Sequence, residues 1–205
     1  MARPASHTYR SALALAGILA AVMLSGCGYT AKPLIDSPRD PPQLRTIRKA
    51  FEALVEKAWH DPDINWHTGG VGNIVVNVVG GDNRGLCYQW QDYLYSGLLP
   101  TVQKAGWCAT GIAANENFEH EHHCVMVWDP KRIREDEILK RPRPEPVYVL
   151  DVWRTGHPNV YWLDDWLDGE APHECPPRVQ KLPEPMIPLP TPGRWEDPKP
   201  NADRK

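Results

Sequence analysis

The chain has 205 residues, of which 41% are hydrophobic and 24% are charged, a composition typical of globular proteins and not of disordered ones. Its formal net charge is −3, and the charge becomes −5 when Arg3 and Arg10 leave with an N-terminal leader. Nucleic-acid binders usually depend on a basic surface, so this charge argues against that class and predicts no nucleic-acid partner. About 178 residues remain after the leader, which is enough for one ordinary domain.

Residues 1–27 predict a bacterial lipoprotein signal peptide. Arg3 and Arg10 precede an apolar run of fourteen residues, Ser11–Leu24. This run is too short to cross a hydrocarbon core of about 30 Å, which favours a cleaved signal over a permanent anchor. It ends in Leu-Ser-Gly-Cys at residues 24–27, which resembles a lipobox, the motif whose cysteine is lipidated and becomes the new N-terminus. An ordinary signal peptide with a chance cysteine is the alternative.

Lipidation of Cys27 predicts a membrane partner on the extracytoplasmic side. Gly28, in place of aspartate at the second position, resembles the enteric lipoproteins that are sorted to the outer membrane. We therefore expect a lipid-anchored protein of the cell envelope, at the outer membrane and facing the periplasm. In a host with a single membrane it would lie on the outer leaflet. This compartment permits disulfide bonds.

The rest of the chain is expected to form one domain between two less regular segments. Residues 28–40 are interpreted as a tether, residues 41–170 as the folded domain and residues 171–205 as a proline-rich tail. Ten of the 22 prolines fall between Pro172 and Pro200, so most of the proline excess belongs to the tail.

Two helices are expected in the domain. The first should begin near Pro41 and end before Pro62, and its apolar residues recur at helical spacing: Leu44, Ile47, Phe51, Leu54, Val55, Ala58 and Trp59. The second covers Leu86 to about Leu99, where Pro100 kinks or ends it.

The segment between these helices, Trp66–Gly85, is rich in glycine and contains the apolar run Ile74–Val79. We interpret the run as a short strand or a buried loop that turns at the following glycines. A phosphate-binding loop is not expected, because Gly69–Gly72 is followed by neither the lysine nor the helix that such a loop needs.

Three strands are expected after the second helix: Trp107–Ile112, His123–Trp128 and Val147–Trp153. The charged segment between the second and third, Asp129–Pro146, carries alternating prolines and is expected to be extended and solvated. Helices followed by an antiparallel sheet predict an α+β domain.

Three residues, Cys87, His123 and Asp151, carry the most informative chemistry. Cys87 lies in the first turn of its expected helix, where the helix dipole stabilises a thiolate. Gly85 removes side-chain bulk beside the sulfur, so a substrate carbonyl could approach. If the strands of His123 and Asp151 are neighbours, the carboxylate could orient the imidazole and fix its tautomer.

The order of these pieces resembles the transglutaminase-like branch of the papain-type cysteine hydrolases. That family places its cysteine at a helix start in a pattern such as Arg84-Gly85-Leu86-Cys87, followed by a glycine and a strand. It then has a histidine that leads an apolar strand, here His123-Cys-Val-Met-Val-Trp128, and an aspartate on the next strand, here Val149-Leu-Asp-Val-Trp-Arg154. The resemblance covers roughly residues 70–155. The separation of His123 from Asp151 is long for the family, which the charged segment would explain.

The resemblance implies a papain-like or transglutaminase-like core and a hydrolase acting as a thiol protease or amidase on a peptide or cell-envelope substrate. Cys87 would attack the carbonyl, His123 would transfer the proton and Asp151 would orient the ring, without a cofactor. The backbone N–H of Cys87 would supply part of the oxyanion hole. Its side-chain donor is undecided among Asn77, Asn83 and Gln89.

His122 competes with His123 for the role of base. On a strand the two point to opposite faces, and both faces are apolar, so periodicity does not decide between them. We prefer His123 because the family motif places histidine directly before the small residue and the valines, here Cys124 and Val125.

A non-catalytic envelope module that binds metal is the alternative function. Strand geometry would put His120, His122 and Cys124 on one face, with His173 or Cys175 completing a zinc or copper site. The usual zinc spacings are absent, so we expect no metal.

The number of cysteines limits the disulfides that the chain can form. With Cys27 lipidated and Cys87 a free nucleophile, one disulfide could form among Cys108, Cys124 and Cys175, and the sequence does not select the pair.

Overall fold

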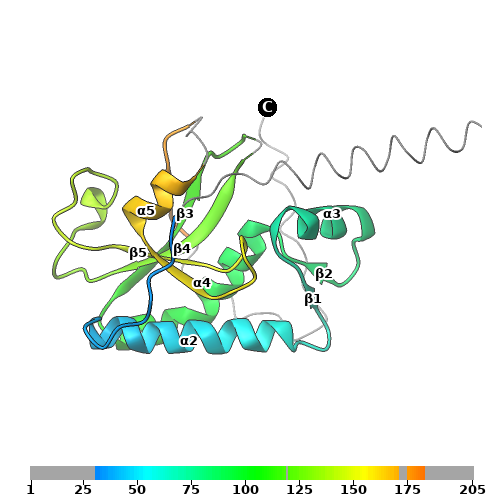
Figure 1. The fold of residues 1–205 in the computed structure, drawn as a ribbon, viewed down its shortest axis with the longest axis horizontal. Coiled ribbons are helices and arrows are strands. Elements are labelled where there is room, and N and C mark those ends of the chain that lie inside the picture. The colour runs from blue at the N-terminus through cyan, green and yellow to red at the C-terminus, as the bar shows by residue number, and fades with distance from the viewer. Residues whose placement is uncertain (1–30, 119, 171–174, 183–205) are drawn as a thin grey trace, which may run out of the picture.

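The computed structural model describes residues 31–118, 120–170 and 175–182. Its centre is a five-stranded antiparallel sheet (Figure 1). From one edge to the other, the strands are β6 (Asn159–Trp162), β5 (Tyr148–Asp151), β4 (His122–Trp128), β3 (Cys108–Ala114) and β7 (Arg178–Gln180). The expected α+β class, with helices packed on an antiparallel sheet, is confirmed.

Helices cover both faces of this sheet. The described α-helices are α2 (Pro42–Trp59), α3 (Gly69–Val79), α4 (Cys87–Lys104) and α5 (Leu163–Gly169). α4 packs against β3, β4 and α2 on one face, and α5 packs against the core on the opposite face. Among the described residues, no helix combines the length and the apolar character that crossing a membrane requires.

The strand β4 is buried along its whole length, which explains why both of its faces are apolar in the sequence. Val125 and Val127 join the core beneath α2 and α4. Met126 and Trp128 join the core beneath α5. Because neighbouring residues on a strand point to opposite faces, His122 and His123 must also separate.

The helix α4 continues through Pro100 to Lys104, beyond the expected end near Leu99. Proline removes one backbone hydrogen bond and costs about 3 kcal/mol in a helix interior. Leu98 and Val102, on either side of it, are fully buried against the core. Their burial offsets that cost, so the helix does not end at the proline.

The apolar run after Thr68 is a helix, α3, so the expected strand or buried loop is wrong. Its β-branched residues favour strands, but no described strand lies beside it for pairing. The short strands β1 (Asn65–Trp66) and β2 (Asn83–Arg84) pair with each other at its base. The backbone groups of the run are therefore satisfied within a helix.

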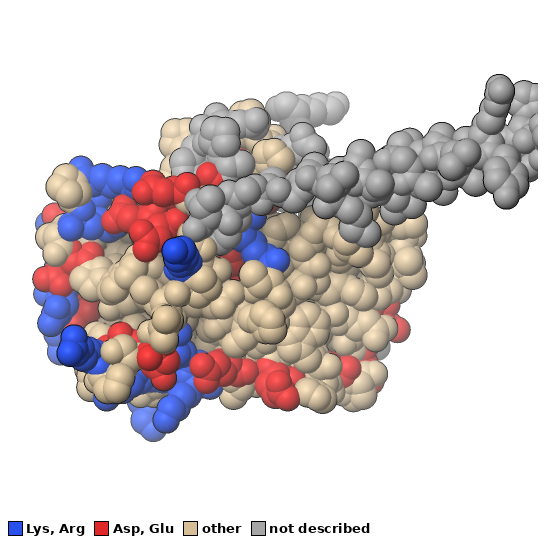
Figure 2. Space-filling model, in the orientation of Figure 1, with Lys and Arg blue, Asp and Glu red and all other residues tan. Residues whose placement is uncertain are grey.

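The charged segment 129–146 is only partly solvated, contrary to expectation. It contains a short 3₁₀ helix, η1 (Glu135–Glu137), and Ile133 and Ile138 are buried in the α5-side core. Its arginines pair with acids, as Arg141 does with Asp168 at 2.7 Å. Figure 2 shows many charged side chains at this end of the molecule.

The strand β7 comes from the segment that was expected to be a tail. It pairs with β3 over Gly111–Ala113, and Thr110 donates a hydrogen bond to the backbone oxygen of Gln180 at 2.5 Å. Neither β7 nor β6 is predicted by the sequence reasoning. The leader, the lipobox cysteine Cys27 and the end of the proline-rich tail lie outside the described residues.

Candidate active site

Cys87 is the first residue of α4, as expected, and its side chain is buried. Its Sγ donates a hydrogen bond to the backbone oxygen of Glu121 at 3.8 Å. In the part of the chain that the structure describes, no hydrogen bond joins this sulfur to His122 or His123. The thiol therefore lies against the backbone that leads into β4.

The turn before Cys87 is fixed by close backbone contacts. Gly85 has φ +146°, and a Cβ there would lie 2.2 Å from the backbone oxygen of His67. The indole N–H of Trp90 donates to that same oxygen at 2.7 Å. The Gln89 side-chain oxygen accepts the N–H of Gly85 at 2.9 Å and that of the next residue at 3.1 Å. Only glycine fits this turn, and the helix start is held rigidly.

The carboxylate of Asp151 pairs with His122 and not with His123. Nε2 of His122 lies 2.8 Å from Oδ2 of Asp151, and both side chains are about 1% exposed. The same nitrogen lies 3.3 Å from Sγ of Cys124. The expected His123–Asp151 pair is therefore wrong.

The strand register explains this correction. In an antiparallel pair, residues directly opposite each other point to the same face. Met126 pairs with Val149 and Val125 with Leu150, so the next pair would place Asp151 opposite Cys124. The carboxylate therefore shares a face with residues 122 and 124.

His123 belongs to the α4 side of the sheet and has a different environment. Its Nε2 lies 2.6 Å from the carboxylate of Glu121, and its Nδ1 lies 3.3 Å from the side-chain oxygen of Gln180. Its ring meets that of Tyr88 edge-on at 6.5 Å. Both ring nitrogens thus face oxygen atoms, which accept hydrogen bonds.

The buried pair is charged. Burial alone would raise the pKa of Asp151, but His122 and then Arg154 lower it to about 2. Burial opposes the charged form of His122, whereas Cys124 and Asp151 raise its pKa well above the usual value. Burial and Asp151 also raise the pKa of the Cys124 thiol, so this thiol stays neutral and the Asp151 carboxylate is what holds the proton on His122.

A second ion pair, Arg154–Glu170, lies next to the His122–Asp151 pair. Arg154 lies 4.0 Å from Asp151 Oδ2 and donates a hydrogen bond to Glu170 at 3.1 Å. The Glu170 side chain is fully buried, and burial raises its pKa. The two cations Arg154 and His122 thus face the two buried carboxylates Asp151 and Glu170.

Three buried polar atoms in this cluster have no hydrogen-bond partner among the described residues. They are Nδ1 of His122, Oδ1 of Asp151 and Nε1 of Trp153. The rings of His122 and Trp153 pack together at 4.9 Å. Buried polar atoms are nearly always paired, so this concentration makes the cluster a candidate functional site.

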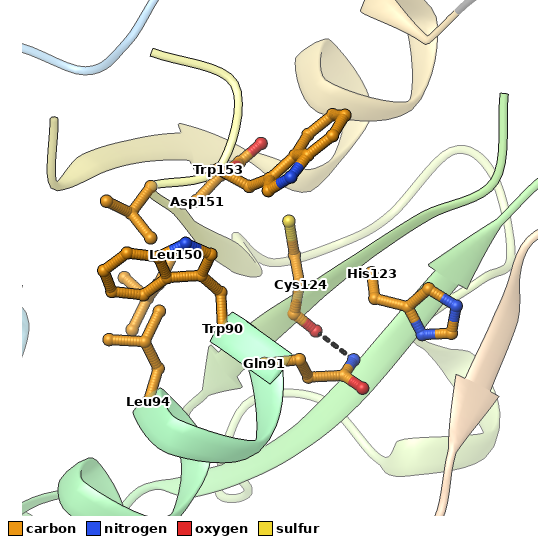
Figure 3. A pocket seen from close by; sticks show the side chains of 9 residues that line it. Trp90, Gln91, Leu94, His123, Cys124, Leu150, Asp151 and Trp153 are labelled. Atoms are coloured by element: carbon orange, nitrogen blue, oxygen red, sulfur yellow. Dashed lines mark hydrogen bonds between the residues drawn. The ribbon is translucent and has the colours of Figure 1, made fainter. Parts of the chain in front are cut away.

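A small crevice, too narrow for a water molecule, lies where α4 meets the ends of β4 and β5 (Figure 3). Its lining includes Trp90, His123, Asp151 and Trp153, but not Cys87. In Figure 3 the sulfur of Cys124 points toward Trp153, while the His123 ring points in a different direction.

Of the three oxyanion candidates, Asn83 has its side-chain donor engaged elsewhere. Asn83 donates to the backbone oxygen of Gly80, and its oxygen lies 2.7 Å from Nε2 of His67. The side-chain oxygen of Gln89 accepts two N–H groups of the turn, which leaves its amide nitrogen as a donor, and Asn77 is exposed on α3. The N–H of Cys87 is in the first turn, where a helix leaves its N–H groups without intrahelical partners, so it is also a donor that the fold offers.

The metal-type cluster also differs from the expected one. Ligand atoms of His122, Cys124 and Asp151 lie within 4.8 Å of one another. His120 is exposed in the turn before β4, and His173 lies outside the described residues. Cys175 donates to the backbone oxygen of Glu116 at 3.6 Å.

The expected disulfide among Cys108, Cys124 and Cys175 does not form, and these cysteines are free. Cys108 pairs with Trp128, whereas Cys124 pairs with Ile112, so these two cysteines lie at different heights of the β3–β4 ladder.

Glu121 and Gln180 were missed by the sequence reasoning. Glu121 could have been found, because it shares a strand face with His123 at a separation of two residues. Gln180 could not, because nothing in the sequence places β7 beside β3.

No known protein family, curated protein or solved structure matches this chain.

Proposed function

We propose that the protein is an extracytoplasmic lipoprotein, anchored through Cys27, whose domain is a transglutaminase-like, papain-related cysteine hydrolase of the cell envelope. Cys87 is the nucleophile, His122 the imidazolium that favours its thiolate and protonates the leaving group, and Asp151 the residue that orients His122. The observation that supports this most is the contact of the Cys87 thiol with the backbone residue directly before the buried His122–Asp151 pair.

The choice of His122 over His123 follows from the hydrogen bonds of the two rings. A ring that exchanges a proton with the reacting atoms needs a nitrogen that no other partner already holds. His122 donates from Nε2 to Asp151, and its Nδ1 has no partner among the described residues. His123 has an oxygen at each nitrogen. Cys124 is not the nucleophile in this scheme, because burial and Asp151 raise its thiol pKa and keep it protonated.

The reaction is acyl transfer from an amide. The Cys87 thiolate, formed by loss of its proton to solvent and favoured by the His122 imidazolium, attacks the carbonyl carbon. The C–N bond then breaks as His122 gives its Nδ1 proton to the leaving amine, and the neutral ring takes a proton from the water that hydrolyses the thioester. The side-chain contacts in the structure are looser than these reaction steps require, as is common before substrate binds.

The test is the alkylation of Cys87 by limiting iodoacetamide, measured by peptide mass spectrometry on the chain from residue 28. We expect rapid labelling of the parent, and labelling at the same pH about tenfold slower or more in His122→Ala, because the imidazolium that favours the thiolate is gone. His123→Ala is the matched control and should label like the parent. Circular dichroism would verify that both variants fold.

Equal labelling of the parent and His122→Ala would overturn the role of His122. Loss of labelling only in His123→Ala would return this role to His123, with Glu121 as its carboxylate partner.

A metal-binding envelope module is the second candidate, and the convergence of His122, Cys124 and Asp151 favours it. Imidazole, thiolate and carboxylate are the ligands that zinc prefers. Arg154, at 4.0 Å from the carboxylate, opposes a cation there. Purification without chelator followed by metal analysis separates the functions, since stoichiometric zinc that is lost in Cys124→Ala but kept in Cys175→Ala would favour the metal module.

A further inference from the structure

Residues 65–84 leave the domain beside Cys87 and return to it, and we call them the apolar excursion. β1 and β2 pair at its base, and the N–H of Gly69 donates to the backbone oxygen of Trp153 at 2.8 Å. Its outer part is α3, which Figure 1 shows at one end of the molecule, away from the sheet. The excursion is thus anchored at the candidate site and projects from it.

The outer face of α3 is aliphatic and uncovered. Val71, Ile74 and Val78 recur at helical spacing and are 54%, 46% and 77% exposed, and Val79 is 70% exposed. Apolar residues at this spacing normally form the face of a helix that is withdrawn from water. A contiguous exposed apolar patch of this kind marks a binding surface.

The helix is also free of charge. Residues 69–81 contain no aspartate, glutamate, lysine, arginine or histidine, in a chain that is 24% charged. In Figure 2 the visible surface at this end of the molecule carries few charged atoms, whereas the opposite end carries many. A surface with neither aromatic anchors nor charged rim suits hydrocarbon better than it suits a protein partner.

We propose that α3 lies in the interfacial region of the phospholipid bilayer that holds the Cys27 lipid, an inference that rests on the lipidation within the proposed function. The first described residue, Ala31, is four positions after Cys27, and four residues span at most about 14 Å. A lipid there would hold the domain against the bilayer. The charge-free end is the face that meets it at least cost, which places Cys87 close to the membrane surface.

The experiment is flotation of the protein with vesicles of phosphatidylethanolamine and phosphatidylglycerol. The chain from residue 28 is used, because it lacks the lipidated cysteine and keeps every described element. We expect the parent to float with the vesicles. The double variant Val78→Asn, Val79→Asn should partition at least tenfold more weakly, since full withdrawal of one valine from water contributes about a factor of ten.

Phe118→Asn is the matched control, because Phe118 is an exposed apolar residue outside the excursion. It should float like the parent. Equal floating of the parent and the double variant overturns the proposal, as does floating that high salt abolishes. A parent that does not float but dimerises through α3 in sedimentation velocity would assign the face to a second copy of the chain.

The result is separable from the proposed function. The test uses neither activity nor acylation, so its failure leaves the alkylation of Cys87 unaffected. Acylation of Cys27 is measured separately, from the mass of the full chain recovered from the envelope.

Discussion

The buried His122–Asp151 pair makes a quantitative prediction for Asp151→Asn. The substitution keeps the shape of the side chain and removes its charge. Oδ2 of Asp151 lies 2.8 Å from His122 and 3.3 Å from the indole nitrogen of Trp166. Asparagine can still accept the indole hydrogen bond, but it no longer stabilises an imidazolium.

The magnitude follows from burial. A shift of the Asp151 pKa from 3.8 to about 2 corresponds to about 2 kcal/mol of stabilisation. Removing one partner of a buried pair usually costs about 3–5 kcal/mol, so we expect a loss of about 3 kcal/mol. With a typical dependence on denaturant, this lowers the urea midpoint by about 1–2 M.

The effect should depend on pH in a specific way. The Asp151 pKa is lowered by folding, so its contribution is present above about pH 3.9 and is lost as the pH falls toward 2. The His122 pKa is raised by folding, so its contribution is complete below about pH 6.5 and is lost as the pH rises through the folded value. The difference between parent and variant should therefore be largest between these limits.

Urea unfolding followed by tryptophan fluorescence at a series of pH values measures this difference. Asp136→Asn is the control, because Asp136 pairs with Arg134 at the surface, and its removal should leave the midpoint nearly unchanged. If Asp151→Asn behaved like this control, or if its effect were the same at every pH, the buried charged pair would be refuted.

Three further substitutions test other parts of the structure. Gly85→Ala would place a Cβ 2.2 Å from a backbone oxygen and should destabilise the fold by at least about 1–3 kcal/mol. Gly81→Ala, with nothing near its Cβ, should cost less. Thermal unfolding of both variants compares these losses, and an equal loss would contradict the close approach at Gly85. Arg154→Met leaves the buried Glu170 without its cation and should cost about 3–5 kcal/mol near neutral pH. That loss should shrink as the pH falls through the raised pKa of Glu170, because the protonated acid is tolerated, and urea unfolding at acidic and neutral pH checks this. Ile138→Ala should cost about 2–5 kcal/mol in chemical unfolding, because its side chain is fully buried; a loss near zero would mean that the charged segment does not dock on the core.

The helices α2 and α4 and the strands β3, β4 and β5 could be predicted because their patterns are local. The apolar spacing of α2 and the short apolar runs of the strands carry their own period. The helix α3 could not be predicted, because its β-branched residues favour a strand. In the fold, β1 and β2 pair with each other, and the run between them has no strand neighbour. Local preference was overridden there by long-range pairing.

The site was predictable in its residue types but not in its pairing. The sequence places Cys87 at a helix start, and this position is confirmed. Whether Asp151 meets His122 or His123 depends on the register between β4 and β5, which a shift of one residue would reverse. Because segment 129–146 lies between the two strands, their register cannot be obtained by counting residues along the sequence.

The pairing of β7 with β3 has a consequence for how the chain matures. A strand left at a sheet edge exposes unpaired backbone groups that invite pairing with another chain. The partner of β3 is β7, Arg178–Gln180, which follows β3 only after three other strands of the chain. The edge of β3 therefore stays open to aggregation until these residues have been synthesised. A nonsense mutation before residue 178 would yield an aggregation-prone fragment, whereas one after residue 182 would leave the sheet complete.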